Sequence, residues 1–106
     1  PSNSMPEPNR LLWISEAGGL TQFGAFIEVL QPGSRSSLKH WHSAEDEMVY
    51  VLEGEITLIE GDAKTILRPG DAATFQAGVP VGHCLENCSA TATRCLVVGT
   101  RSAVDT

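Results

Sequence analysis

The sequence predicts an all-β fold, because short apolar segments alternate with turn signals at intervals of about ten residues. These segments are rich in branched and aromatic residues, and no stretch shows the periodicity of an amphipathic helix. The chain has 106 residues, which is the size of a single domain. We therefore expect one barrel or sandwich of antiparallel strands over residues 10–106. The polar, proline-rich residues 1–9 are expected to be disordered or tag-derived and to lie outside the fold.

Each expected strand is bounded by residues that favour turns. The Pro32-Gly33 pair ends the first expected strand, and Gly54 ends the second. Gly61-Asp62 forms a two-residue connection suited to a tight hairpin, because glycine tolerates positive φ. Pro69-Gly70 fits the centre of a type II turn. The seven strands predicted in this way cover residues 23–30, 47–52, 55–60, 63–67, 72–75, 82–86 and 91–98.

Composition and charge argue against several classes of protein. The formal net charge is −6 with only seven lysine and arginine residues, so we expect no nucleic-acid partner. No apolar run approaches the roughly 20 residues that a membrane-spanning helix needs, so we expect no membrane partner. The three cysteines, Cys84, Cys88 and Cys95, show no two-residue spacing typical of redox or zinc sites. We interpret them as reduced thiols of a cytoplasmic protein.

The histidines are the first indication of a chemical site. His40 and His42 are two residues apart, so in an extended segment both side chains leave the same face and Trp41 points away. Glu47 can join them if the chain bends between them, and His83 can return from a later strand. Three imidazoles and a carboxylate suit a divalent transition metal (Fe, Mn, Ni, Zn or Cu) rather than Ca or Mg. Taken alone, the His-x-His pair also fits two half-exposed polar residues beside an acidic loop.

The order of these residues resembles the first signature of the cupin superfamily. That signature consists of a glycine, a His-x-His pair, a glutamate and a second glycine. Here Gly33, His40, His42, Glu47 and Gly54 follow that order, with Gly33 one residue further from the histidines than is usual.

A second stretch is similar to the other cupin signature. It runs from Gly70 to Asn87 and contains His83, three residues before the asparagine. It departs from the family pattern in two ways, since Gln76 replaces a proline and residues 79–82 are about two residues longer than the common form. The resemblance extends over residues 22–98.

The resemblance implies a fold and a ligand set. Cupins are jelly-roll barrels of two antiparallel sheets, with a metal inside held by three histidines and a glutamate. By position these are His40, His42, Glu47 and His83. An octahedral metal would keep two positions for water, O2 or a bidentate substrate, whereas a tetrahedral zinc would be saturated and structural. Asn87, Gln76 and backbone carbonyl groups are candidate partners for the second nitrogen of the histidine rings.

Strand alternation also predicts an exposed apolar surface. If Glu47 points inward, Val49 and Val51 do so too. The residues expected to point outward are Met48, Tyr50 and Leu52, on the side where Trp41 also projects. Either an N-terminal strand around residues 11–14 covers this face or a second subunit does, and the cupin resemblance favours a homodimer.

The sequence leaves the activity open between two functions. An open metal beside Val49, Val51 and Phe75 would suit a dioxygenase, isomerase or lyase acting on a small oxygenated organic molecule. Glu47 is the only candidate base, and no separate base stands out. The alternative is a non-catalytic module in which the metal orients or senses a small-molecule ligand, or holds the barrel together.

Three neighbouring polar residues are expected to play no direct part. Glu45 and Asp46 are interpreted as solvated loop charges, because only Glu47 has the family's spacing to Gly54. Alternation turns Cys84 away from the metal, which makes it a packing thiol.

Overall fold

Every regular element in the described part of the chain is a β-strand. The computed structural model describes residues 9–36, 45–79 and 81–101. Within these residues no helix forms, and therefore no helix is long and apolar enough to cross a membrane. The strands are β1 (Arg10–Trp13), β2 (Phe23–Leu30), β3 (Glu47–Glu53), β4 (Ile56–Glu60), β5 (Ala63–Leu67), β6 (Ala72–Phe75), β7 (His83–Glu86) and β8 (Thr93–Thr100).

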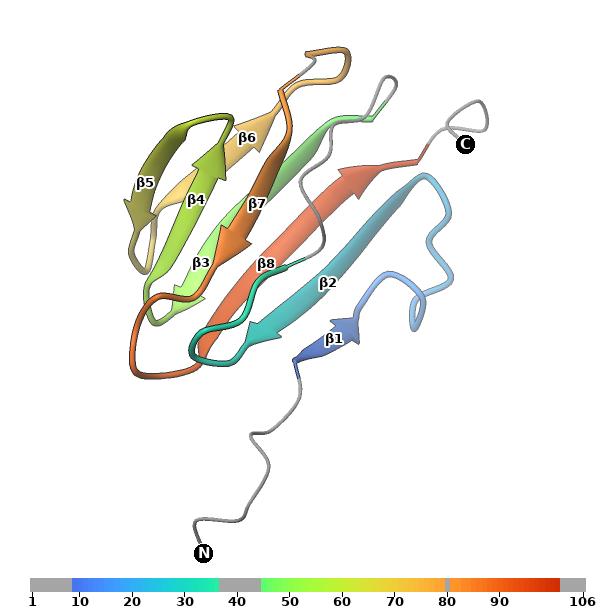
Figure 1. The fold of residues 1–106 in the computed structure, drawn as a ribbon. Coiled ribbons are helices and arrows are strands. Elements are labelled where there is room, and N and C mark those ends of the chain that lie inside the picture. Colours follow the sequence, from blue (N-terminus) through green and yellow to red (C-terminus); the bar gives the residue numbers. More distant parts are fainter. Residues whose placement is uncertain (1–8, 37–44, 80, 102–106) are drawn as a thin grey trace, which may run out of the picture.

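The strands form two antiparallel sheets that lie against one another. The larger sheet has the order β1-β2-β8-β3-β6, and the smaller has the order β5-β4-β7. Figure 1 shows the smaller sheet over the part of the larger one that contains β6, β3 and β8. The expected all-β jelly-roll class of two antiparallel sheets is confirmed.

The expected closure into a barrel is not found among the described strands. No strand ladder joins the two sheets within residues 9–36, 45–79 and 81–101. An isolated bridge between Arg35 and Glu86 connects the segment after β2 to β7. The described strands therefore form an open sandwich, whose larger sheet extends beyond the smaller one at β1 and β2 (Figure 1).

The turns form where glycine supplies the required backbone conformation. Gly61 has a φ of 56° at the first central position of the β4–β5 hairpin, which pairs Glu60 with Ala63. Gly70 has a φ of 93°, and the Asp71 amide donates to the Arg68 carbonyl oxygen at 2.8 Å. This is the predicted type II turn. Both local predictions are confirmed.

Most strand bounds agree with the prediction, and the largest difference is in β8. That strand was predicted over residues 91–98 but covers Thr93–Thr100. Its start is delayed because the Thr91 carbonyl oxygen accepts hydrogen bonds in the preceding turn from Asn87 and Ser89. It continues to Thr100 because that residue pairs with Phe23 of β2. Side-chain patterning within eight residues could not indicate this long-range pairing.

Side chains on β3 alternate between the core and the outer surface as predicted. Val49 and Val51 are 3% and 0% exposed, whereas Tyr50 is 38% exposed. Both valines belong to a core between the sheets that also includes Ile56 from β4 and Leu85 from β7. The inward direction of Glu47 follows from the same alternation.

The N-terminal strand does not cover the outer face of β3. β1 pairs with β2 at the far edge of the larger sheet, so β2 and β8 separate it from β3. Covering by residues 11–14 is thus wrong as an explanation for the apolar side chains there. Asn9 also contacts the domain, since its Oδ1 accepts hydrogen bonds from the Gln31 amide and the Ser34 hydroxyl.

The turn between β3 and β4 generates a first prediction. Gly54 has a φ of 78°, and an added Cβ would lie 2.8 Å from the Ala92 carbonyl oxygen. Gly54→Ala should therefore lower the free energy of unfolding by about 2–4 kcal/mol, from backbone strain and overpacking together. The matched control is Gly61→Ala, which also has positive φ but meets nothing within 4 Å, and it should cost about 1 kcal/mol. Urea denaturation measures the free energy of unfolding of both variants. Equal losses would contradict the extra cost that we assign to the contact with the Ala92 carbonyl oxygen.

Candidate metal centre

Two of the four expected metal ligands meet between the sheets. Glu47 begins β3 in the larger sheet, and His83 begins β7 in the smaller one. The Nε2 atom of His83 lies 2.8 Å from Oε1 of Glu47. The histidine is 7% exposed, so the pair lies largely out of solvent. Two side chains that are 36 positions apart in sequence are thus in direct contact.

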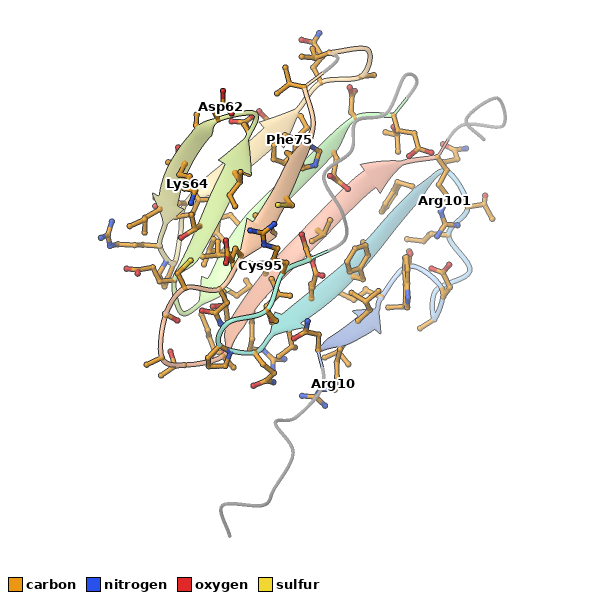
Figure 2. The ribbon with its side chains drawn as sticks, viewed as in Figure 1. Arg10, Asp62, Lys64, Phe75, Cys95 and Arg101 are labelled. Atoms are coloured by element: carbon orange, nitrogen blue, oxygen red, sulfur yellow. The ribbon has the colours of Figure 1, made fainter. Side chains whose placement is uncertain are left out.

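An aromatic ring fixes the plane of the His83 imidazole. Phe75 ends β6 and pairs with Glu47, so its ring lies beside the same carboxylate. The rings of Phe75 and His83 stack with centroids 3.7 Å apart and an interplanar angle of 3°. Figure 2 labels Phe75 at the end of the two layers where β6 ends and β7 begins. This packing holds the imidazole with Nε2 directed at Glu47, as a ligand requires.

The pair borders two cavities. The outer cavity has a volume of about 260 Å³ and the inner one of about 130 Å³, and Glu47 and His83 line both. The outer cavity is also lined by Glu45, Glu60, Thr74, Phe75, Gln76, Val79 and Val81. The inner cavity is also lined by Leu11, Phe26, Glu28, Ser36, Val49, Leu85 and Val97. A small molecule in either cavity would therefore reach these two side chains.

The distance between the two donor atoms fits a shared metal ion. Ligand atoms that are about 2.1 Å from a metal and at right angles to each other lie roughly 3 Å apart. His83 Nε2 and Glu47 Oε1 are joined by a hydrogen bond of 2.8 Å, and this distance also matches the spacing of two ligand atoms. An imidazole and a carboxylate are also the donor types that suit a divalent transition metal.

The other two expected ligands cannot be placed. His40 and His42 lie outside the described residues. In the described part of the chain, no group of three or more histidine, cysteine, aspartate or glutamate residues could hold a metal. The four-ligand set therefore stays a prediction.

Asn87 has a different role from the one expected. Its side chain is fully buried, and Nδ2 donates to the carbonyl oxygens of Leu30 and Thr91 at 2.8 Å. Its Oδ1 accepts hydrogen bonds from the amide and hydroxyl of Ser89. Asn87 thus holds the turn between β7 and β8 to the end of β2, because its amide group is engaged with these residues. Gln76, the other candidate, lines the outer cavity.

The acidic residues before Glu47 have separate positions. Glu45 lines the outer cavity. Asp46 is more than a solvated loop charge, because its Oδ1 accepts a hydrogen bond from the Ala77 amide at 2.8 Å. Its backbone amide and carbonyl also bond to Thr100. Asp46 therefore ties the start of β3 to the ends of β6 and β8.

The cysteines are packing groups where they are buried. Cys84 is 3% exposed and lies beside His83 in sequence, but it lines neither cavity around the pair. Burial, and then the charge of Glu28, raises the pKa of Cys95 to about 12, so this thiol stays protonated. All three cysteines are free.

Glu28 is a candidate functional residue that the sequence analysis missed. It lies in the middle of β2 between Phe26 and Leu30, which pack in the core, and it lines the inner cavity with Glu47 and His83. Burial raises the pKa of Glu28, and the negative charge of Glu47 raises it further. A signal was present in the sequence, since a single carboxylate stands at an inward position of an otherwise apolar strand.

Comparison with solved structures finds close likeness in fold. A sugar phosphate isomerase from a cupin superfamily of Silicibacter pomeroyi is 42% identical, with a TM-score of 0.86 over 89% of this chain and 60% of that chain. A protein from Acidithiobacillus ferrooxidans, provisionally named a sugar phosphate isomerase, is 31% identical, with a TM-score of 0.87 over 92% of this chain and 62% of that one. This chain therefore spans about three fifths of the length of each.

A more distant structure shares the fold over more of its own length. A protein from Thermotoga maritima, described as a predicted oxalate decarboxylase, is 26% identical with a TM-score of 0.71. The match covers 89% of this chain and 79% of that chain. No protein with curated annotation matches the chain.

The family itself is identified by its sequence profile. The profile described as "Cupin domain" matches residues 26–99, which contain Glu47, Phe75 and His83. The match covers well over half of the chain and agrees with the two-sheet fold and with the relative that is 42% identical. The chain belongs to the cupin family.

Proposed function

We propose that this chain binds one divalent transition metal through His40, His42, Glu47 and His83 and isomerises a sugar phosphate or a related polyhydroxylated carbonyl compound. The observation that carries the proposal is the contact between His83 and Glu47 at the wall of two cavities. The naming of the relative that is 42% identical as a sugar phosphate isomerase supports the substrate class. Iron, manganese, nickel, zinc and copper all suit this donor set.

Each described residue of the site has a role in this proposal. The metal, when bound, would act as a Lewis acid that polarises a carbonyl oxygen. Glu47 and His83 would hold it at the cavity wall, and Phe75 would keep the imidazole ring in place by stacking. Glu60 brings a further carboxylate to the outer cavity, where it can accept hydrogen bonds from sugar hydroxyl groups.

The charge of the outer cavity constrains how a sugar phosphate would lie. Glu45, Glu47 and Glu60 all line this cavity. A bound metal would offset the charge of Glu47, but Glu45 and Glu60 would still repel a phosphate dianion placed against them. We therefore expect the sugar hydroxyls to enter the cavity and the phosphate to point toward solvent.

The ligand assignment predicts which variants lose the metal. His42→Ala and His83→Ala should each lose most of the bound metal, because removing one of four donors weakens coordination. Glu45→Ala should keep about one metal per chain, since Glu45 is not among the proposed ligands. Elemental analysis of the purified proteins measures the ratio. Full metal content in both histidine variants would contradict the assignment.

The activity is tested with defined substrates. The protein is loaded separately with Fe, Mn, Ni, Zn or Cu and incubated with ribose 5-phosphate, glucose 6-phosphate or mannose 6-phosphate. Carbon-13 NMR should show an aldose converting to its ketose with at least one metal, and the conversion should disappear after chelation and in His83→Ala. If no metal supports conversion while the sugars still bind, the alternative of a ligand-binding or sensing module is correct.

We also propose that the chain forms a homodimer through the outer face of β3. Met48, Tyr50 and Leu52 are between 36% and 39% exposed on this face, and β1 does not cover them. Three large apolar side chains on one face are typical of an interface.

The small-molecule substrate and this second copy are the partners we propose. The negative charge argues against nucleic acid. The three free cysteines support a cytoplasmic location.

The dimer predicts a defined change in mass. Light scattering should give the unaltered protein about twice its chain mass of 11.3 kDa. Tyr50→Asp should shift it to the monomer, because a carboxylate in an apolar interface lacks a partner. Glu53→Gln, at the exposed end of the same strand, is the control and should leave the mass unchanged. A monomeric unaltered protein would refute the proposal.

A further inference from the structure

The proposed isomerisation needs a group that moves a proton between adjacent carbons. Glu47 is poorly suited to this task, because its carboxylate already contacts His83 and is proposed to hold the metal. A carboxylate near the metal but outside its ligand set would be better placed. Glu28 meets both conditions, as its place in the sheet shows.

Glu28 faces the site from a different strand. It lies on β2, opposite Leu11 of β1 and Cys95 of β8. Because β8 separates β2 from β3, Glu28 and Glu47 are two strands apart, roughly 10 Å across the sheet. Glu28 pairs with Cys95, which pairs with Val51, so Glu28 also lies four residues further along the sheet than Glu47. Glu28 can therefore meet a substrate whose reacting carbons extend past Glu47 and His83 into the inner cavity, while its other hydroxyl groups stay in the outer cavity.

The inner cavity connects Glu28 to the proposed ligands. Glu28, Glu47 and His83 all line this space of about 130 Å³, and its other walls are mostly apolar. A carboxylate in apolar surroundings is a stronger base than one in water, because burial destabilises its charged form. The raised pKa of Glu28 agrees with this environment.

We propose that Glu28 is the catalytic carboxylate that transfers a proton between the adjacent carbons of the substrate. This inference rests on the proposed isomerase function. Glu28 removes the proton from the carbon beside the carbonyl, and the electron pair of that C–H bond forms a C=C bond as the carbonyl oxygen takes a proton from solvent water. The former carbonyl carbon of the resulting enediol then takes the proton from Glu28, while the hydroxyl on the adjacent carbon returns a proton to solvent water and becomes the carbonyl. Substrate and product are isomers, so no oxidant or reductant is needed.

The experiment compares carboxylate variants of the full chain loaded with the supporting metal, in D2O, with the same three sugar phosphates. Glu28→Gln should lower kcat and the incorporation of deuterium into the sugar together, by about 10²–10⁴-fold, while KM changes little. Glu28→Asp keeps a carboxylate and should recover part of both rates. Glu53→Gln, an exposed carboxylate paired with Arg94, should behave like the unaltered protein.

Metal content and thermal unfolding of each variant separate the outcomes. The proposal requires Glu28→Gln to keep about one metal per chain and a folded state. If this variant keeps its metal and the full kcat, Glu28 has no role and the isomerase function stands without it. If Glu28→Gln loses its metal, Glu28 acts by supporting the metal site and proton transfer is refuted. If the unaltered protein neither converts nor deuterates any of the three sugars, the isomerase function fails, and this inference fails with it.

Discussion

The packing of the smaller sheet on the larger one is the constraint on which the candidate site depends. His83 and Glu47 begin strands in different sheets, and only this packing brings Nε2 of one to 2.8 Å from Oε1 of the other. The valines that follow Glu47 on β3 join the core that holds the sheets together. Alternation along β3 therefore has two effects. It buries the valines in the core, and it directs the Glu47 carboxylate toward the space between the sheets.

Buried or half-buried polar groups lie beside this core, and they have different physical explanations. Asn87 is fully buried, and its hydrogen bonds to Leu30 and Thr91 compensate for the loss of water. His83 is held by Phe75 and Glu47. Glu28 differs, because burial and a nearby negative charge both disfavour its ionised form. A carboxyl group in surroundings that disfavour its charge is a candidate for a functional role.

The sequence predicted much of the fold but only part of the site. The turns at Gly61 and Gly70 were predictable because a few neighbouring residues decide their geometry. Glu28 was missed, because a lone carboxylate in an apolar strand is visible in the sequence but its proximity to Glu47 is not. The role of Asn87 was also misjudged, since its partners lie up to 57 residues away.

The sequence by itself determined the strand-rich class, the turns, the alternation along β3 and the candidate metal ligands, because these depend on local backbone preferences and residue type. The tertiary structure decided which of these residues meet. It placed β1 at the edge of the sheet, stacked Phe75 on His83 and brought Glu28 to the inner cavity. These arrangements arise from strand pairing and core packing between distant segments, whose energies depend on the whole chain rather than on any one stretch of it.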